Sequence, residues 1–141
     1  MKKGIIAWSA IIFVLALTVS LFAGSIGGFG GRGGFNYIPA PRLLSPITDD
    51  VDLSGKEFLE FKWTLQNPVA IRGYDFRLYK GYNTSSDTLV FKQQIEGDVD
   101  SFQIKSSELE INQVYTWKLR AIGMSGVKSD SSFSPFKIVK R

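Results

Sequence analysis

The 141-residue sequence contains neither cysteine nor histidine. Without cysteine the chain cannot form a disulfide, so a folded domain must be held together by packing alone. Without histidine it cannot build a Ser-His-Asp or Cys-His catalytic group, and it lacks the most common zinc ligand and the usual pH switch. Most hydrolase chemistry is therefore excluded, and we expect a protein that is not an enzyme and needs no cofactor.

The charge of the chain points to no particular partner. Seventeen Lys and Arg against thirteen Asp and Glu give a formal net charge of +4. Lys2, Lys3 and Arg32 precede the region with the composition of a domain, which leaves fourteen basic and thirteen acidic side chains, a net charge of +1. No stretch of the sequence forms a basic stripe, so we expect no nucleic-acid partner.

A long apolar run begins shortly after the N-terminus. Over residues 5–23 the polar side chains are one Thr and two Ser, and none of these nineteen residues is charged. As a helix, the run spans about 28 Å, close to the hydrocarbon thickness of a bilayer. A soluble core helix has a polar face, which this run lacks. The sequence therefore predicts one N-terminal hydrophobic helix.

Residues 1–24 are either a signal peptide or a transmembrane anchor. Lys2, Lys3 and the small residues near Ala23 are typical of a cleaved signal peptide, but the run exceeds the usual apolar length of about 7 to 15 residues. If it is not cleaved, residues 4–23 lie in the membrane. In both cases the two lysines hold the N-terminus in the cytoplasm. We therefore expect the rest of the chain outside, either anchored to the membrane or secreted or periplasmic after cleavage.

The segment GGFGGRGGF (27–35) has the appearance of an RNA-binding RGG motif. Such motifs act on nucleic acid in many copies with several arginines, whereas this segment has one Arg and follows an export signal. We therefore interpret residues 25–40 as a Gly-rich flexible linker that ends in the stiffer, Pro-containing piece YIPAP.

From residue 42 onward, apolar and polar side chains alternate, as in strands with one buried and one exposed face. The clearest runs are LEFKWTL (59–65), YDFRLYK (74–80) and YTWKLRA (115–121). Shorter or less regular strands are expected at 42–47, 88–95, 101–105 and 135–140. Turn residues separate these runs, and none of them has the pattern of a helix. Seven antiparallel strands in about 100 residues predict an all-β sandwich of two sheets.

The inward side of this alternation supplies the predicted core. Large apolar or aromatic side chains recur at every second position of the three clearest runs, as expected of a buried strand face. The residues assigned to the structural core are Phe61, Trp63, Phe76, Tyr115, Trp117 and Leu119.

The order of the motifs PRLLSP, LEFKW, YDFRLYKG and YTWKLRAIG resembles that of bacterial extracellular fibronectin type III domains, over residues 41–141. The resemblance implies an immunoglobulin-like sandwich with Trp63 between its sheets. It also implies that Tyr115 forms a tyrosine corner, with its hydroxyl bonded back to the preceding turn. Ile111 stands where the family often has Pro, which leaves the conformation of that turn open.

The fold does not by itself give the function. The resemblance implies a non-catalytic interaction, adhesion or spacer module, whose partner is an unknown protein or a surface polysaccharide. The alternative is a carbohydrate-binding module of the cell envelope, which requires a planar row of exposed aromatic side chains. Candidates for that row are Tyr79, Tyr82 and Phe91, and Met124 is a further candidate for a binding surface.

Acidic residues gather in two stretches, Asp49 to Asp52 and Asp98 to Asp100. Carboxylates on loops are calcium ligands, but neither stretch has the spacing of an EF-hand, and Asp-rich turns are ordinarily solvated. We predict no metal site. A glycosidase would need two carboxyl groups facing each other across a cleft, and a sandwich this small offers no obvious cleft.

Overall fold

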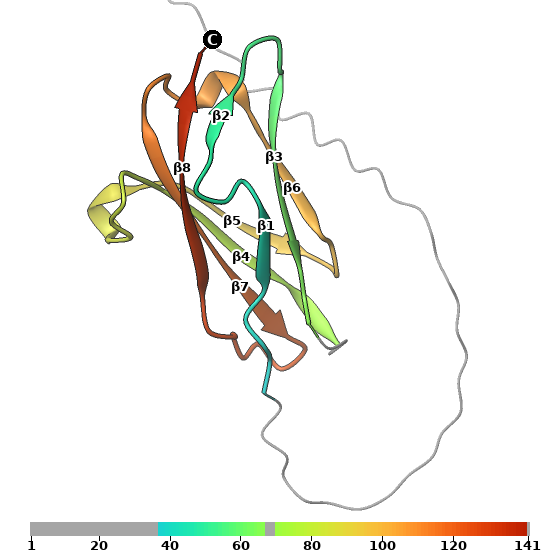
Figure 1. Cartoon of the computed structure of the whole chain (residues 1–141). Coiled ribbons are helices and arrows are strands. Elements are labelled where there is room, and N and C mark those ends of the chain that lie inside the picture. Colours follow the sequence, from blue (N-terminus) through green and yellow to red (C-terminus); the bar gives the residue numbers. More distant parts are fainter. Residues whose placement is uncertain (1–36, 67–69, 141) are drawn as a thin grey trace, which may run out of the picture. The chain divides into compact units, whose positions relative to one another are not determined.

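The computed structural model describes residues 37–66 and 70–140. They form strands and two single 3₁₀ turns (Figure 1). The strands are β1 (Arg42–Ser45), β2 (Asp50–Asp52), β3 (Phe58–Thr64), β4 (Ile71–Lys80), β5 (Leu89–Glu96), β6 (Ser101–Lys105), β7 (Val114–Gly123) and β8 (Ser132–Val139). The turns are η1 (Ser86–Thr88) and η2 (Ser106–Glu108).

The predicted hydrophobic helix within residues 1–24 lies outside the described residues. Within 37–66 and 70–140, the structure contains no helix with the length and apolar character needed to cross a bilayer.

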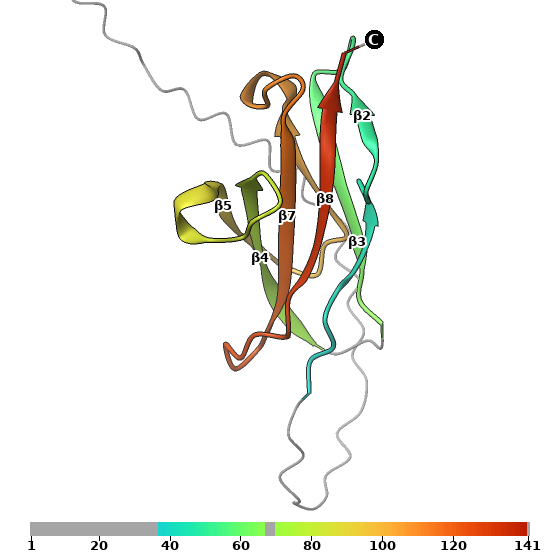
Figure 2. The same ribbon diagram turned by 60° about the vertical axis from the view of Figure 1, so that its left-hand side comes forward.

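Two sheets pack face to face, as the alternating pattern predicts. The first has the strand order β1-β3-β6, and the second has the order β2-β8-β7-β4-β5. Figure 2 shows the turned view, in which β8 lies next to β7 and β2 follows on its other side. Within each sheet the neighbouring strands are antiparallel, with the exception of β2, which runs parallel to β8.

The predicted count of seven antiparallel strands is therefore wrong by one strand, β2. The acidic stretch at residues 49–52 had the composition of a turn, but its backbone pairs with β8. The N–H of Lys137 donates to the carbonyl of Asp49 at 3.0 Å, and the N–H of Thr48 donates to the carbonyl of Pro135 at 2.9 Å. The chain thus leaves the first sheet after β1 and joins the edge of the second one at β2.

Aromatic rings fill the space between the sheets. Phe61 on β3 makes edge-to-face contacts with Phe76 at 5.0 Å, Trp117 at 5.2 Å and Phe136 at 5.7 Å between ring centroids. Such contacts add stability beyond the burial of their area. The structure places all six residues assigned to the core in this cluster, each at most 3 % exposed.

Tyr115 lies at the start of β7 and ties this strand to the turn that precedes it. Its hydroxyl accepts a hydrogen bond from the backbone N–H of Glu110, five residues earlier, at 2.9 Å. The ring stacks on Phe136 at 5.9 Å. This is the tyrosine corner that the family resemblance implies. Ile111, the position that departs from the family pattern, is 53 % exposed on the turn that the hydroxyl spans.

The folded region begins before residue 41. Ile38, which the sequence assigned to the linker, is 5 % exposed and belongs to the hydrophobic core. The side chain of Ile38 packs closely against Gly123. A Cβ atom added to Gly123 would lie only 2.5 Å from the Cδ1 atom of Ile38. The domain therefore includes Ile38 rather than starting at Pro41.

Candidate functional site

The outer face of the five-stranded sheet collects basic side chains. By strand alternation, this face carries the residues of β4, β5, β7 and β8 that point away from the aromatic core. The basic face is the set formed by these strand residues and by Lys128, which reaches this face from the loop after β7: Arg77, Lys92, Lys118, Arg120, Lys128 and Lys137. Three of them form a row across neighbouring strands, because Arg77 is paired in register with Lys92 on β5 and with Lys118 on β7.

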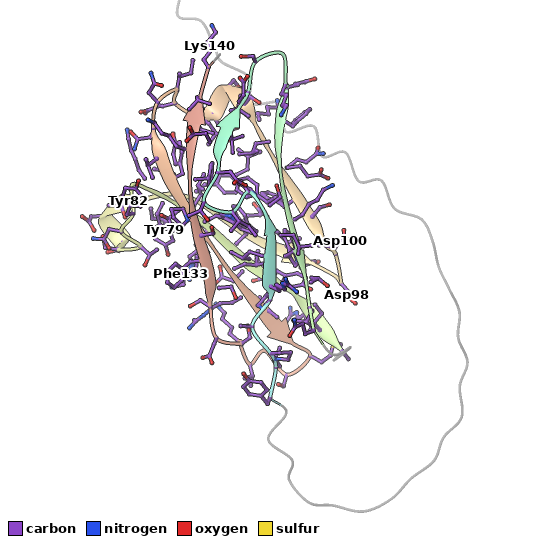
Figure 3. All side chains as sticks on the ribbon, viewed as in Figure 1. Tyr79, Tyr82, Asp98, Asp100, Phe133 and Lys140 are labelled. Carbon is purple, nitrogen blue, oxygen red and sulfur yellow. The ribbon has the colours of Figure 1, made fainter. Side chains whose placement is uncertain are left out.

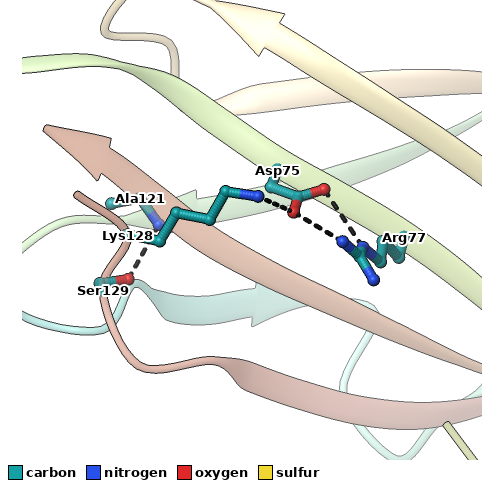
Figure 4. Close-up of polar contacts among 5 residues, drawn as sticks. All are labelled: Asp75, Arg77, Ala121, Lys128 and Ser129. Carbon is teal, nitrogen blue, oxygen red and sulfur yellow. Dashed lines mark hydrogen bonds and ion pairs between the residues drawn. The ribbon is translucent and has the colours of Figure 1, made fainter. Parts of the chain in front are cut away.

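One buried carboxylate stands within the basic face. Asp75 on β4 is 5 % exposed, and two cations converge on it in Figure 4. Arg77 binds it with two nitrogens, Nε to Oδ1 at 3.3 Å and Nη2 to Oδ2 at 3.1 Å, and Lys128 reaches Oδ2 with Nζ at 2.9 Å. Bonds of this charge-assisted kind offset the cost of removing a carboxylate from water.

These contacts decide the charge state of Asp75. Burial by itself would raise the pKa of the carboxyl, but the hydrogen bonds from Arg77 and Lys128 outweigh it, so the pKa of Asp75 lies below its ordinary value. The group is therefore ionised at neutral pH and serves as an internal counter-ion rather than as a proton donor.

The loop that carries Lys128 is fixed beside β7. The hydroxyl of Ser129 accepts a hydrogen bond from the N–H of Ala121 at 2.9 Å and donates one to the carbonyl of Asp130 at 2.8 Å. Figure 4 shows the contact between Ser129 and Ala121 next to Lys128. Lys128 therefore reaches Asp75 from a position that the backbone holds in place.

The other cations of the basic face are not neutralised in this way. Within the described part of the chain, the ion pairs do not include Lys118, Arg120 or Lys137. The Nε atom of Arg120 is buried and has no hydrogen-bond acceptor there. Phe133 on β8 is the register partner of Lys118 and is 66 % exposed. An exposed aromatic ring thus continues the row of cations.

The residues proposed as a binding surface from the sequence do not gather at one place. Tyr79 is 2 % exposed, so it is not available as part of a binding surface and instead covers the edge of the core, the other role that its position on an outward strand face allows. Phe91 is half-buried and packs on Phe76 and Phe102. Tyr82 and Met124 are exposed, at 76 % and 68 %. The planar row that a carbohydrate platform needs is therefore not formed by these tyrosines and Phe91.

Tyr82 and Met124 lie at opposite ends of β7. Gly81, next to Tyr82, bonds through its N–H to the carbonyl of Val114, where β7 begins. Met124 follows Gly123, where β7 ends. A ten-residue strand is about 33 Å long, so the two side chains cannot belong to one small site.

A cavity of about 610 Å³ lies at one end of the sandwich, lined by Trp63, Tyr74, Asp98 and Asp100 among others. Figure 3 shows the two aspartates well away from Tyr82 and Phe133. Burial raises the pKa of Tyr74, and the neighbouring carboxylates add to the rise, so the phenol stays protonated. Within residues 37–66 and 70–140, no group of three or more acidic side chains could hold a metal ion.

Sequence comparison gives no relatives for this chain. The sequence matches no protein-family model, and it matches no curated protein at a significant level.

Comparison of structures, in contrast, gives clear matches. A structure described as that of a myokine has a TM-score of 0.53 and 16 % identity, over 74 % of this chain and 99 % of the other. The third fibronectin III domain of the human KIAA0343 protein has a TM-score of 0.50 and 16 % identity, over 83 % and 95 %. The fibronectin(III)-like modules of Clostridium thermocellum CbhA have a TM-score of 0.48 and 15 % identity, over 71 % and 96 %.

Identities at this level speak for the fold alone. The matches with TM-scores of 0.53 and 0.50 agree with the two-sheet arrangement, in which β1 and β2 are divided between the sheets. The described part of this chain has the fibronectin type III fold.

Proposed function

We propose that this chain is a non-catalytic interaction module that works outside the cytoplasmic membrane and binds its partner through the basic face. The observation that carries the proposal is the row formed by Arg77, Lys118 and Phe133 in register across β4, β7 and β8. In this row Lys118 takes part in none of the described ion pairs and lies in register with the exposed ring of Phe133. Aromatic residues and Arg are enriched at binding surfaces.

The partner is a protein or a surface polysaccharide that carries negative charge. Asp75 neutralises Arg77 and Lys128 from within, but Lys118 and Arg120 remain without a carboxylate in the described ion pairs. Complementary charge guides a partner to the correct face and raises the rate of association. A neutral partner would leave these cations to be desolvated without compensation.

The proposed location rests on the N-terminal sequence. Lys2 and Lys3 before the apolar run at residues 5–23 favour an orientation with the domain on the outer side. Either a retained anchor or a cleaved signal peptide leads to that side. The experiment is to fractionate cells and sequence the mature N-terminus. Intact Lys2 in the membrane pellet supports a tether, a soluble protein that begins near Gly24 supports secretion, and a cytoplasmic protein contradicts the proposal.

The binding face is tested by placing a photoreactive amino acid at position 133 of the full chain in intact cells. Illumination is expected to attach a partner at this position and not at Leu44, which is 47 % exposed on β1 in the other sheet. Charge reversal by Lys118→Glu should reduce the attachment. Equal attachment at positions 133 and 44, or no effect of the charge reversal, would contradict the basic face as the binding surface.

A further inference from the structure

The five-stranded sheet ends in an open edge at β5. In the described residues, the edge strands of the two sheets are β1 and β6 in one and β2 and β5 in the other. β5 has eight residues and contains no proline, whereas β1 has four, β2 three and β6 five. A long regular edge is a template for pairing with another strand. β5 is therefore the edge of this sandwich best suited to accept one.

The register of β5 on β4 fixes which of its backbone groups are free. The N–H of Gly97 donates to the carbonyl of Arg72 at 2.8 Å, so these two form a hydrogen-bonded pair. In an antiparallel ladder such pairs alternate with non-bonded ones, and Gly73 to Leu78 pair without interruption with Glu96 to Phe91. The even-numbered residues of β5 therefore direct their N–H and C=O groups away from β4. Within this uninterrupted stretch they are Lys92, Gln94 and Glu96.

The free edge carries one positive side chain, Lys92, two residues before Gln94, and one negative side chain, Glu96, two residues after it. Lys92 and Glu96 are exposed and take part in none of the ion pairs within the described residues. Across the sheet, Lys92 lies opposite Arg77, which has the same charge, and Glu96 lies opposite Gly73, which has no side chain. Neither charge is compensated inside the domain.

We propose that β5 pairs with β5 of a second copy of this chain, antiparallel and centred on Gln94. In that arrangement Gln94 faces its own copy, and Lys92 of each chain faces Glu96 of the other. The free N–H and C=O groups at positions 92, 94 and 96 then all find partners. Two identical ion pairs form on the outer face, and the two five-stranded sheets become continuous. Such a contact is closed and two-fold symmetric.

Charge selects this register among those that the backbone allows. Centring the pair on Lys92 would bring two lysines face to face, which is destabilising. Centring it on Gln93 would set Lys92 against Gln94 and leave Glu96 without a cation. A lysine on an edge strand usually prevents pairing with another strand. Among these three registers, only the one centred on Gln94 gives Lys92 an oppositely charged partner.

The apolar side chains near this edge also favour a covering strand. Phe91 and Ile95 pack on the core but remain partly exposed, as does Phe102 on the neighbouring edge strand β6. A second β5 laid along the edge shields the side chains of Phe91 and Ile95. Burial of apolar surface then adds to the hydrogen bonds of the new ladder.

The test uses the absence of cysteine from the full chain, which makes any introduced cysteine unique. Gln94→Cys in the full-length protein in detergent is treated with a short bismaleimide, and a product of twice the mass is expected. Gln103→Cys is the matched control, since Gln103 is exposed on β6, the edge of the other sheet. Cross-linking at position 103 equal to that at position 94 would overturn the proposal.

Charge exchange tests the register. Lys92→Glu and Glu96→Lys each create two like-charge contacts in the Gln94→Cys background, and each is expected to weaken association about tenfold. The double exchange Lys92→Glu with Glu96→Lys restores the attraction and the cross-linked product. Equal melting temperatures of the variants exclude unfolding as the cause. The proposal would be overturned if cross-linking is unchanged in both single variants, or if the double exchange does not restore the cross-linked product.

The same samples separate self-pairing from capture of a different protein. Purified protein alone must give the product, and a band that requires another protein counts against a second copy as the occupant. Lys92 belongs to the basic face, so the separation of the two proposals rests on Glu96→Lys, which adds no negative charge to that face. Loss of cross-linking in Glu96→Lys with unchanged attachment of a partner at position 133 reports on the pairing of β5 alone.

Discussion

The indole N–H of Trp117 on β7 donates a hydrogen bond to the carbonyl of Pro46, 2.8 Å away and 71 residues earlier in the chain. Pro46 lies between β1 and β2, where the chain passes from one sheet to the other. Trp63, the other large ring at the centre, is equally buried, but its nearby polar partner is the side chain of Tyr74 rather than a backbone carbonyl. The two tryptophans therefore fill the core alike, but only Trp117 forms a hydrogen bond to the segment between β1 and β2.

Trp117→Phe is expected to destabilise the protein more than Trp63→Phe. Both changes remove similar volume, but only the first leaves the buried Pro46 carbonyl without its donor, which adds about 1 to 2 kcal/mol. Urea unfolding of the two variants measures the difference. A smaller loss for Trp117→Phe than for Trp63→Phe would show that the bond to Pro46 contributes nothing.

Tyr115→Phe is expected to lower the free energy of unfolding by about 1 kcal/mol. The ring still stacks on Phe136, while the N–H of Glu110 loses its acceptor. Tyr82→Phe is the control, because Tyr82 is 76 % exposed and its loss of a hydroxyl should be neutral. Thermal melts check both, and equal midpoints would argue against the tyrosine corner as a stabilising contact.

Stability is expected to fall at low pH through Asp75. Its pKa in the folded protein is below the unfolded value of about 3.9, so the carboxylate binds fewer protons when folded. Its contribution is therefore fully present above the unfolded pKa and is lost as the pH falls through the folded pKa. Urea titrations between pH 2 and 7 should show this loss in the wild type and a flatter profile in Asp75→Asn.

At neutral pH, Asp75→Asn is expected to cost about 2 kcal/mol. Breaking a fully buried ion pair costs about 3 to 5 kcal/mol, and the value is smaller here because Arg77 and Lys128 are partly exposed to solvent. Glu110→Gln is the comparison, since its pair with Lys80 is exposed on both sides and should contribute little. A cost no larger than that of Glu110→Gln would contradict the role of Asp75 as an internal counter-ion.

Ile38→Ala is expected to destabilise the domain by about 2 to 4 kcal/mol. Its side chain is buried against Gly123, although the sequence placed it in a linker. Its neighbour Tyr37 is 72 % exposed, so Tyr37→Ala serves as the control. If thermal unfolding gives the same melting temperature for Ile38→Ala and Tyr37→Ala, Ile38 does not belong to the core.

Much of the sandwich follows from alternation alone. The runs at 59–65 and 115–121 become β3 and β7, whose inward aromatic rings meet in the core. The missed strand β2 has three residues, two of them Asp, and its pairing comes from β8, more than eighty residues away. A short strand of that composition carries no local signal, because its hydrogen-bond partner decides the structure.

The candidate site was less accessible to sequence reasoning. Tyr79 was correctly placed opposite the inward residues, but β4 has a neighbour on each side, and Thr116 and Leu89 flank the ring in register. Its burial therefore depends on tertiary context. The basic face also has no linear signature, since its cations come from four different strands, one or two to a strand, and from the loop that carries Lys128.

The position of β8 also has a consequence for the order of assembly. β8 is the last strand of the described residues, yet it lies between β7 and β2, and it holds β2 in the sheet. A chain that is synthesised from its N-terminus delivers β8 after the other described strands. Until residues 132–139 emerge, the acidic segment at 49–52 has no strand to join. Completion of the five-stranded sheet therefore depends on the last of the described strands, and β2 cannot take its place in the sheet before β8 arrives.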